Sequence, residues 1–488
     1  MKKIFSIIVF TIILFGCSES FLDRQPEDTL APGIFFKTAA DIKTGVVAVY
    51  QPLQSIFGFT YLPYILGQMS DDGTRSFTSS VQHTFYKDNT NSEPFLWDSF
   101  YKMIVNANNI IDIIDNYELK SDAEATVINA YRGEAAFLRA FAYFYLVRLY
   151  GDVPMVVERF NDPGTAFGMG RTPVNNIYNE VIIPDLEYAI ANCYAKGNAA
   201  IAGEKARATK GAALTILGKV YLTMNNHAKA AETLQKLIVD KTAGNYELID
   251  FSKIWLPSNK FNNESIFEIN YNVAAGSPSF YYRNMSGTLA YDVYKMSTPS
   301  GLLTGEKDLM DDFVASGEST RYRISVDSGF TPLNGLYSPL PLKMMPPLSI
   351  VASIDRIGTD YNYMVTRYAD ALLMYAEALM VQGQKDQAAI YVNQVRERGD
   401  MPSVTGADLN IDFILHERRM ELVFEGHRYF DLVRTGKAIE KISAVLMNDN
   451  EYEGRIFRND PIPAYQLILP IPVGEIEKDQ TLTQNPGY

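Results

Sequence analysis

The chain has 488 residues, 47% of them hydrophobic, which is enough for one large core or for two to three ordinary ones. Its 57 acidic residues outnumber 44 basic ones, and the resulting formal net charge of −13 argues against nucleic acid and anionic lipid as partners. The 31 tyrosines exceed what a core needs, and tyrosine suits surfaces that bind through a flat ring and a hydroxyl.

The first 32 residues indicate where the protein resides. A basic start precedes an apolar run over residues 4–15, which is too short to span a bilayer and is typical of a signal-peptide core. The run ends in LFGC at residues 14–17, which is similar to a lipobox and predicts cleavage before Cys17 and acylation of that cysteine. Several acyl chains make a stable membrane anchor. We therefore expect a signal peptide at 1–16 and a lipidated tether at 17–32; an ordinary secreted protein is the alternative.

Apolar residues at helical spacing then predict long helices. We expect the first from Ala39 to about Phe57, the second over Pro94–Tyr117 with its proline in the first turn, and the third over Ala123–Tyr150. Trp97 in the second helix is expected to pack in the core rather than to stack on a ligand.

Two later segments resemble tetratricopeptide repeats, which are about 34 residues long. In the segment 206–240 the characteristic positions are Leu217, Gly218, Tyr221, Ala230 and Leu234. In the segment 367–399 they are Tyr375, Ala376, Leu379, Ala388 and Val392. The small residues let two antiparallel helices approach closely and the large ones fill the seam. The prediction is an all-α fold, a tetratricopeptide-like helical superhelix whose scaffold covers residues 35–245 and 362–440.

The remaining parts of the chain differ from this scaffold. Residues 246–361 hold many Gly, Pro, Ser, Asn and Tyr residues, with one short strand-like run at Ser265–Tyr271. This punctuation predicts a long irregular, loop-rich insertion on the ligand side of the scaffold. Residues 441–488 are expected to form an extended C-terminal segment.

Residues that would support catalysis or bind metal are few. If Cys17 is acylated, Cys193 stands alone, so neither an intramolecular disulfide nor a cysteine-based metal site is possible, and Cys193 is expected to be a buried small hydrophobe. The four histidines show no metal-ligand spacing, and no nucleophile elbow of the form GxSxG is present. The carboxylate pairs Asp71-Asp72 and Asp311-Asp312 are expected by chance in so acidic a chain. We expect no enzyme activity, no metal and no cofactor.

The stretch 416–437, HERRMELVFEGHRYFDLVRTGK, mixes alternating charges with large apolar side chains and predicts two helical segments broken at Gly426. The charged residues that recur at helical spacing are Arg418, Glu421, Glu425, Arg428, Asp431 and Arg434. So many charges beside aromatic residues predict an internal, hydrogen-bonded ion network that fixes how two helices cross. The alternative is a solvated charged face, because surface ion pairs are common and individually weak.

The same stretch carries a family resemblance. Residues 417–434 follow the pattern E-R-x-x-E-L-x-F-E-G-x-R-x-x-D-L-x-R, which resembles the late region of the SusD/RagB family of Bacteroidetes outer-membrane lipoproteins. Further segments that are similar to the family lie at 21–23, 97–108, 132–140, 151–154, 367–378 and 469–488. The resemblance thus covers nearly the whole chain and implies a single SusD-like domain over residues 33–488.

For function, the resemblance implies a protein anchored by lipid at the cell surface, on the outer face of the outer membrane. It would capture a glycan nutrient and deliver it to a SusC-like TonB-dependent transporter. Peptide remains an alternative ligand, and a structural lid or interaction scaffold without ligand affinity remains an alternative class.

Two loop segments are candidates for ligand contacts. Six aromatic residues lie between Tyr271 and Tyr294 among glycines and serines, and flat rings on loops can stack on the C–H faces of sugars. The second loop, 69–86, is polar. The expected ligand-binding residues are Asp71, Arg75, Tyr281, Tyr282, Arg283 and Tyr291. Tyrosines that pack the loops onto the scaffold are the alternative, and the absence of a Trp-rich platform leaves the ligand class open.

Overall fold

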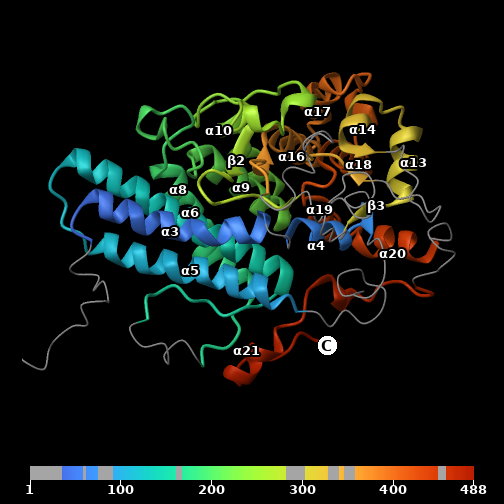
Figure 1. Cartoon of the computed structure of the whole chain (residues 1–488). Helices are drawn as coiled ribbons and strands as arrows, with labels where there is room; N and C mark the ends of the chain where they lie inside the picture. Colours follow the sequence, from blue (N-terminus) through green and yellow to red (C-terminus); the bar gives the residue numbers. More distant parts are fainter. Residues whose placement is uncertain are drawn as a thin grey trace, which may run out of the picture.

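The computed structural model describes residues 36–58, 62–74, 92–160, 168–281, 303–327, 340–345, 358–448 and 458–488. Helices dominate this part of the chain, as the all-α prediction requires (Figure 1). Cys17, with the expected signal peptide and tether, lies outside the described residues.

Three long helices lie side by side at the N-terminal end of the fold (Figure 1). They are α3 (Ala39–Gly58), α5 (Pro94–Asp115) and α6 (Asp122–Tyr150). Their bounds agree with the predicted ones to within two residues. Helix α6 begins where the Ser121 side chain accepts a hydrogen bond from the Glu124 amide, and it ends at Gly151, whose φ of 74° breaks the helical path. Trp97 of α5 is buried, as predicted, with its ring 5.1 Å from that of Tyr150.

Shorter elements connect this bundle to the rest of the chain. They are α4 (Leu62–Gln68), α7 (Val174–Ile177), the π-helical turn η3 (Tyr178–Ile182), α8 (Ile183–Asn192) and the 3₁₀ turns η4 (Ala199–Ile201), η5 (Phe251–Lys253) and η6 (Pro257–Asn259). Cys193 follows α8 and is buried, in agreement with the prediction.

Both predicted repeats form helix pairs. The first pair is α9 (Lys210–Thr223) with α10 (His227–Ile238), and the second is α16 (Tyr368–Val381) with α17 (Lys385–Arg398). At Gly218 the helices approach so closely that an added Cβ would lie 2.7 Å from Cγ of Leu234. A small residue is therefore required there, as the repeat pattern predicts. The superhelical arrangement of further repeats stays a prediction.

The described strands form three two-stranded antiparallel sheets. The pairs are β1 (Gly73–Thr74) with β3 (Thr304–Gly305), β2 (Ser265–Ile269) with β6 (Tyr363–Arg367), and β4 (Val326–Asp327) with β5 (Leu340–Pro341). The strand-like run predicted at Ser265–Tyr271 is thus β2. Its partner β6 leads directly into α16, so the sheet connects the insertion to the second repeat.

The region 246–361 contains more helix than the prediction of irregular structure allowed. It includes α13 (Lys307–Ala315) and α14 (Thr320–Ser325). The physical reason is that Leu309, Met310 and Phe313 recur at helical spacing and are buried.

The expected boundary of the extended C-terminal segment at residue 441 is also wrong. Helix α20 covers Ala438–Asn448, because Ile442 and Leu446 are spaced to bury one helical face. Beyond it, only η8 (Ala464–Leu467) and α21 (Val473–Lys478) interrupt the described part of an otherwise irregular segment.

The ion network predicted for 416–437 lies inside the protein. The stretch folds as α18 (Ile411–Leu422) and α19 (Arg428–Arg434), separated at Gly426, whose φ is 77°. Arg367 donates to Glu421 at 2.5 Å, to Glu425 at 2.8 Å and to Glu264 at 2.6 Å, and none of these side chains is exposed. Burial alone would raise the pKa of Glu421, but the guanidinium groups around it, Arg398 first among them, lower it to about 2. The alternative of a solvated charged face is excluded for this part of the helix.

Candidate functional site

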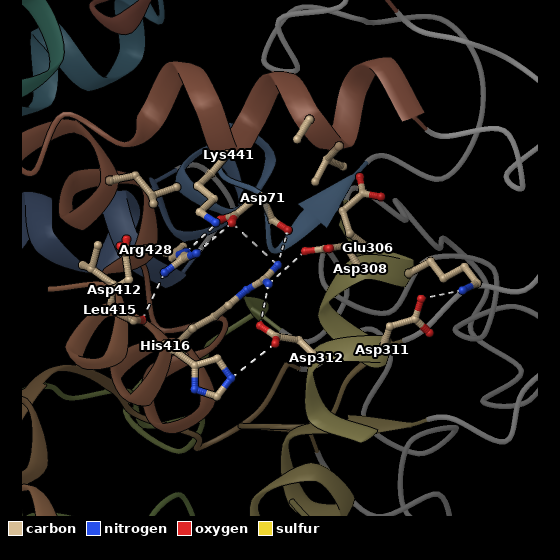
Figure 2. A pocket seen from close by; sticks show the side chains of 15 residues that line it. Asp71, Glu306, Asp308, Asp311, Asp312, Asp412, Leu415, His416, Arg428 and Lys441 are labelled. Atoms are coloured by element: carbon tan, nitrogen blue, oxygen red, sulfur yellow. Dashed lines mark hydrogen bonds and ion pairs between the residues drawn. The ribbon is translucent and has the colours of Figure 1, made fainter. Parts of the chain in front are cut away.

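A cavity of about 590 Å³ opens between α13, α18, α19 and α20, beside the turn that follows α4 (Figure 2). Charged side chains dominate its wall. Its lining residues are Asp71, Glu306, Lys307, Asp308, Asp311, Asp312, Asp412, Leu415, His416, Arg419, Arg428, Leu432, Lys441, Ala444 and Val445. We call it the acidic pocket, because six of these residues are acidic and four are lysine or arginine.

Arg419 of α18 lines the acidic pocket and bonds side chains from two other segments. Its guanidinium donates to Asp72 Oδ1 at 2.8 Å. It also donates to Asp308 Oδ2 and Asp312 Oδ2, each at 2.9 Å. Since the two latter residues lie on α13, this one side chain holds α13 against α18.

Asp71 lies beside Arg419 and is fully engaged by a second arginine. Arg428 donates to its two carboxylate oxygens at 2.8 and 2.7 Å, a bidentate pairing. Burial would raise the pKa of Asp71, but Arg419 and Arg428 outweigh burial and hold that pKa well below its usual range. Asp71 therefore shapes the wall of the acidic pocket as a permanently charged, hydrogen-bonded group.

Other carboxylates of the acidic pocket face solvent. The side chains of Asp308, Asp311 and Asp412 are 59%, 64% and 60% exposed. A carboxylate accepts hydrogen bonds and donates none when ionised, so these groups suit a ligand rich in hydroxyl donors or positive charge. They disfavour an anionic ligand.

His416 lies on the rim of the acidic pocket, between α18 and α13. Its Nε2 is 3.0 Å from Ser316 Oγ and 3.2 Å from Asp312 Oδ1. Burial raises the pKa of Asp312, but His416 and Arg419 together bring it below its ordinary value. The arrangement keeps Asp312 charged.

The structure buries the one candidate aromatic residue that it describes. Tyr281 is 5% exposed, its ring lies 5.6 Å from that of Tyr363, and its hydroxyl donates to the Phe424 carbonyl at 2.9 Å. These contacts correspond to the packing alternative rather than to a stacking platform. Arg75, Tyr282, Arg283 and Tyr291 lie outside the described residues.

The polar candidate loop is joined to the segment 303–306 where the loop leaves the described structure. Gly73 pairs with Gly305 and Thr74 with Thr304 in the β1–β3 ladder, and the Glu306 amide donates to the Asp72 carbonyl at 3.0 Å. Because Asp71 and Glu306 both line the acidic pocket, the polar loop leaves the described structure at the edge of that pocket.

Sequence reasoning missed Asp308 and Asp412 as pocket residues. A signal for the first was present, because Asp308 and Asp311 lie on the polar face of a short amphipathic helix that composition alone concealed. No local pattern marks Asp412, because it lines the pocket only through the packing of α20 near α18.

Among the residues that the structure describes, no group of three or more His, Cys, Asp or Glu side chains is placed to hold a metal ion. The helices among them are also all too short or too polar to cross a membrane.

Comparisons with known proteins agree with the architecture. The profile described as "SusD family" matches residues 334–488, and the profile described as "Starch-binding associating with outer membrane" matches residues 20–222. "SusD-like protein P2" of Formosa agariphila is 28% identical over 531 residues, covering the full length of both chains.

Solved structures show the same likeness. A "Laminarin binding SusD-like protein" superposes with a TM-score of 0.75 at 26% identity, covering 93% of this chain and 100% of that one. "Surface glycan-binding protein A" from Bacteroides uniformis superposes with a TM-score of 0.76 at 22% identity, covering 92% and 99%, and this second likeness concerns the fold.

Proposed function

Because this chain belongs to the SusD family, we propose that it binds a glycan at the cell surface and delivers it to a SusC-like TonB-dependent transporter. The observation that carries the proposal is the likeness, over nearly the whole length, to a laminarin-binding SusD-like protein. Its role is binding rather than catalysis.

We place the glycan in the acidic pocket. The exposed carboxylates of Asp308, Asp311 and Asp412 would accept hydrogen bonds from sugar hydroxyls, and the apolar side chains of Leu415 and Val445 line the same cavity. The proposed contacts from the neighbouring loops are Arg75, Tyr282, Arg283 and Tyr291. Asp71 would position the wall through its pair with Arg428.

The acidic wall also limits the kind of glycan. A uronic or sulfated sugar would bring negative charge beside exposed carboxylates, and like charges at short range repel. We therefore propose a neutral glycan, a class that includes laminarin and starch.

Titration calorimetry of the purified protein tests this function. The probes are laminarin, soluble starch, polygalacturonate as an acidic glycan, and a mixed peptide digest. Binding of a neutral glycan with none of polygalacturonate is expected. Peptide binding alone would favour the peptide alternative, and no binding of any probe would favour a lid or scaffold role.

Location has a separate test. We propose that Cys17 carries the lipid anchor, so Cys17→Ala should abolish labelling by fatty acid and move the protein to the soluble periplasmic fraction. Cys193→Ala is the matched control and should leave lipid labelling unchanged, because Cys193 is buried. Retention of the Cys17→Ala protein in membranes would contradict the anchor.

A further inference from the structure

A second, much smaller cavity lies in the interior, where α6, α9 and the α18–α19 elbow (residues 423–427) meet. Its volume is about 20 Å³, and Arg148, Lys219, His427, Arg418, Asp431 and Arg434 contribute to its wall. A space of roughly 10–15 Å³ already holds one water-sized particle, so this cavity suits a single small species. Sulfate and phosphate are too large for it.

His427 lines this cavity and carries a buried ring nitrogen without a hydrogen-bond partner. Its Nδ1 lies 3.2 Å from Lys219 Nζ, and an ammonium group only donates, so Nδ1 is the acceptor and the imidazole proton resides on Nε2. The residue is 8% exposed, and its buried Nε2 has no hydrogen-bond partner. A buried donor without an acceptor is costly, and the cavity is where an acceptor fits.

Arg148 adds a positive charge that forms no ion pair with a carboxylate among the described residues. Its Nε donates to the Phe144 carbonyl at 2.9 Å, and its guanidinium lies 3.6 and 3.8 Å from the ring centres of Phe144 and Phe430. The Tyr145 hydroxyl also interacts with it. Among the residues that the structure describes, no carboxylate forms an ion pair with Arg148, whereas both oxygens of nearby Asp431 are used by Arg418 and Arg434.

The charges around the cavity sum to an excess of one positive charge. The cations are Arg148, Lys219, Arg418 and Arg434. The carboxylates bonded to them are Asp370, Asp431 and Glu377. Burial lowers the pKa of His427 to about 4, so this ring is neutral at pH 7 and does not alter the sum.

We propose that this cavity binds one monovalent anion of halide size, held by the Nε2–H of His427 and the guanidinium of Arg148. The anion accepts a hydrogen bond from the unpartnered Nε2–H of His427, and it also neutralises the excess positive charge. It thereby ties α6, which carries Arg148, to α9 and to the α18–α19 elbow. A water molecule would satisfy the hydrogen bond but leave the buried charge uncompensated.

The test is thermal melting of the purified full chain in increasing sodium chloride or bromide, with sodium gluconate holding the ionic strength constant. A saturable rise of the melting temperature on the order of 1–2 °C is expected with either halide. Arg148→Met keeps an aliphatic side chain between the aromatic rings but removes the charge, so its melting temperature should no longer rise with halide. His427→Asn keeps an acceptor for Lys219 but lacks the Nε2–H, and should also lose most of it.

Arg132→Met is the matched control. Arg132 lies on the same helix and its guanidinium stacks on Tyr188 at 4.4 Å, but it bonds Asp115 at 2.6 Å, so its replacement should leave the halide response intact. An identical response in wild type and His427→Asn would overturn the proposal, even if Arg148→Met fails to fold.

A crystal structure in sodium bromide gives the direct view. An anomalous peak in the cavity beside His427 Nε2, together with the solution response, supports the site. A water molecule there with no anomalous signal overturns it. A bromide peak without any solution response means binding at crystal concentration only, and this outcome also overturns the proposal.

Discussion

Helix α18 places ionisable side chains in two different surroundings. On one face Glu417, Arg418 and Glu421 are buried and bonded to partners from β6, α14, α16 and α17. On the other, Asp412 and His416 are partly exposed at the acidic pocket. Buried ion pairs build the fold, whereas the exposed pairs at the cavity, such as that of Asp412 with Lys437, remain accessible to a ligand.

Arg419 lies at the boundary between these two faces. Its guanidinium is 4% exposed, yet two of its partners, Asp308 and Asp312, are 59% and 31% exposed. The buried arginine thus fixes the positions of carboxylates that reach solvent. Mutations on the two sides should therefore separate stability from binding.

The largest expected effect is on the buried face. Glu421→Gln would leave Arg367 and Arg398 without part of their compensating charge, and removing one partner of a buried ion pair costs about 3–5 kcal/mol. Denaturant unfolding measures this loss. Glu440→Gln is the control, because Glu440 is 64% exposed, and its free energy of unfolding should change by less than about 0.5 kcal/mol. Equal values for the two variants would contradict the assignment of the network to the fold.

Acid should lower the stability that the buried ion pairs of α18 provide. Glu421 and Asp431 have pKa values lowered to about 2, from ordinary values of 4.5 and 3.8, because the arginines around them overcome burial. A lowered folded-state pKa gives stability that is present above the unfolded value and lost as pH falls. The free energy of unfolding should thus drop by roughly 3 kcal/mol from Glu421 alone between about pH 5 and pH 2. Glu421→Gln should show a shallower decline, and an equally steep one would count against this cause.

A substitution in the repeat scaffold tests the contribution of helix packing to stability without changing any charge. Gly218→Leu would force α9 and α10 apart where Leu234 leaves no room, costing about 1–3 kcal/mol by overpacking. Gly203→Leu is the control, because nothing lies within 4 Å of its added Cβ. The melting temperature reports both, and glycan affinity should stay unchanged in both. An unshifted melt for Gly218→Leu would mean that this pair does not pack as a repeat.

Tyr281 is expected to contribute to stability and not to glycan binding. Tyr281→Phe would remove the hydrogen bond to the Phe424 carbonyl and lower the free energy of unfolding by about 1 kcal/mol. Glycan affinity, measured by titration calorimetry, should not change. Weaker glycan binding with an unchanged melting temperature would mean that Tyr281 contacts the ligand.

The smallest effect on stability is expected at the acidic pocket. Asp412→Asn should alter the free energy of unfolding by less than about 0.5 kcal/mol, because its carboxylate is largely exposed. It should nevertheless weaken neutral-glycan binding about tenfold, since a hydrogen bond to a charged acceptor is worth about 1.5–3 kcal/mol. Asp112→Asn, in a similarly exposed ion pair on α5, is the control and should keep full affinity.

The sequence was sufficient for features that depend on local spacing. The long helices follow from apolar residues at helical spacing, the break follows from Gly426, and the two repeat pairs follow from positions within one repeat of about 34 residues. The burial of the ion network could also be predicted, because alternating charges beside aromatic residues need internal partners.

The partners themselves could not be predicted. Arg419 bonds Asp72 from 347 positions away and Asp308 from 111 positions away, and no local pattern carries such a pairing. Loop composition predicts an exposed Tyr281, whereas its burial depends on contacts with Tyr363 and Phe424. The acidic pocket is likewise a product of tertiary packing.

The most direct test of the central claim is a structure of the protein with a bound neutral oligosaccharide. Laminarin fragments are the first ligand to use, in view of the laminarin-binding relative. We predict sugar density between α13 and α20, with hydroxyl groups within hydrogen-bond distance of Asp311 and Asp412. Sugar bound elsewhere, with the acidic pocket still filled by solvent, would contradict the account.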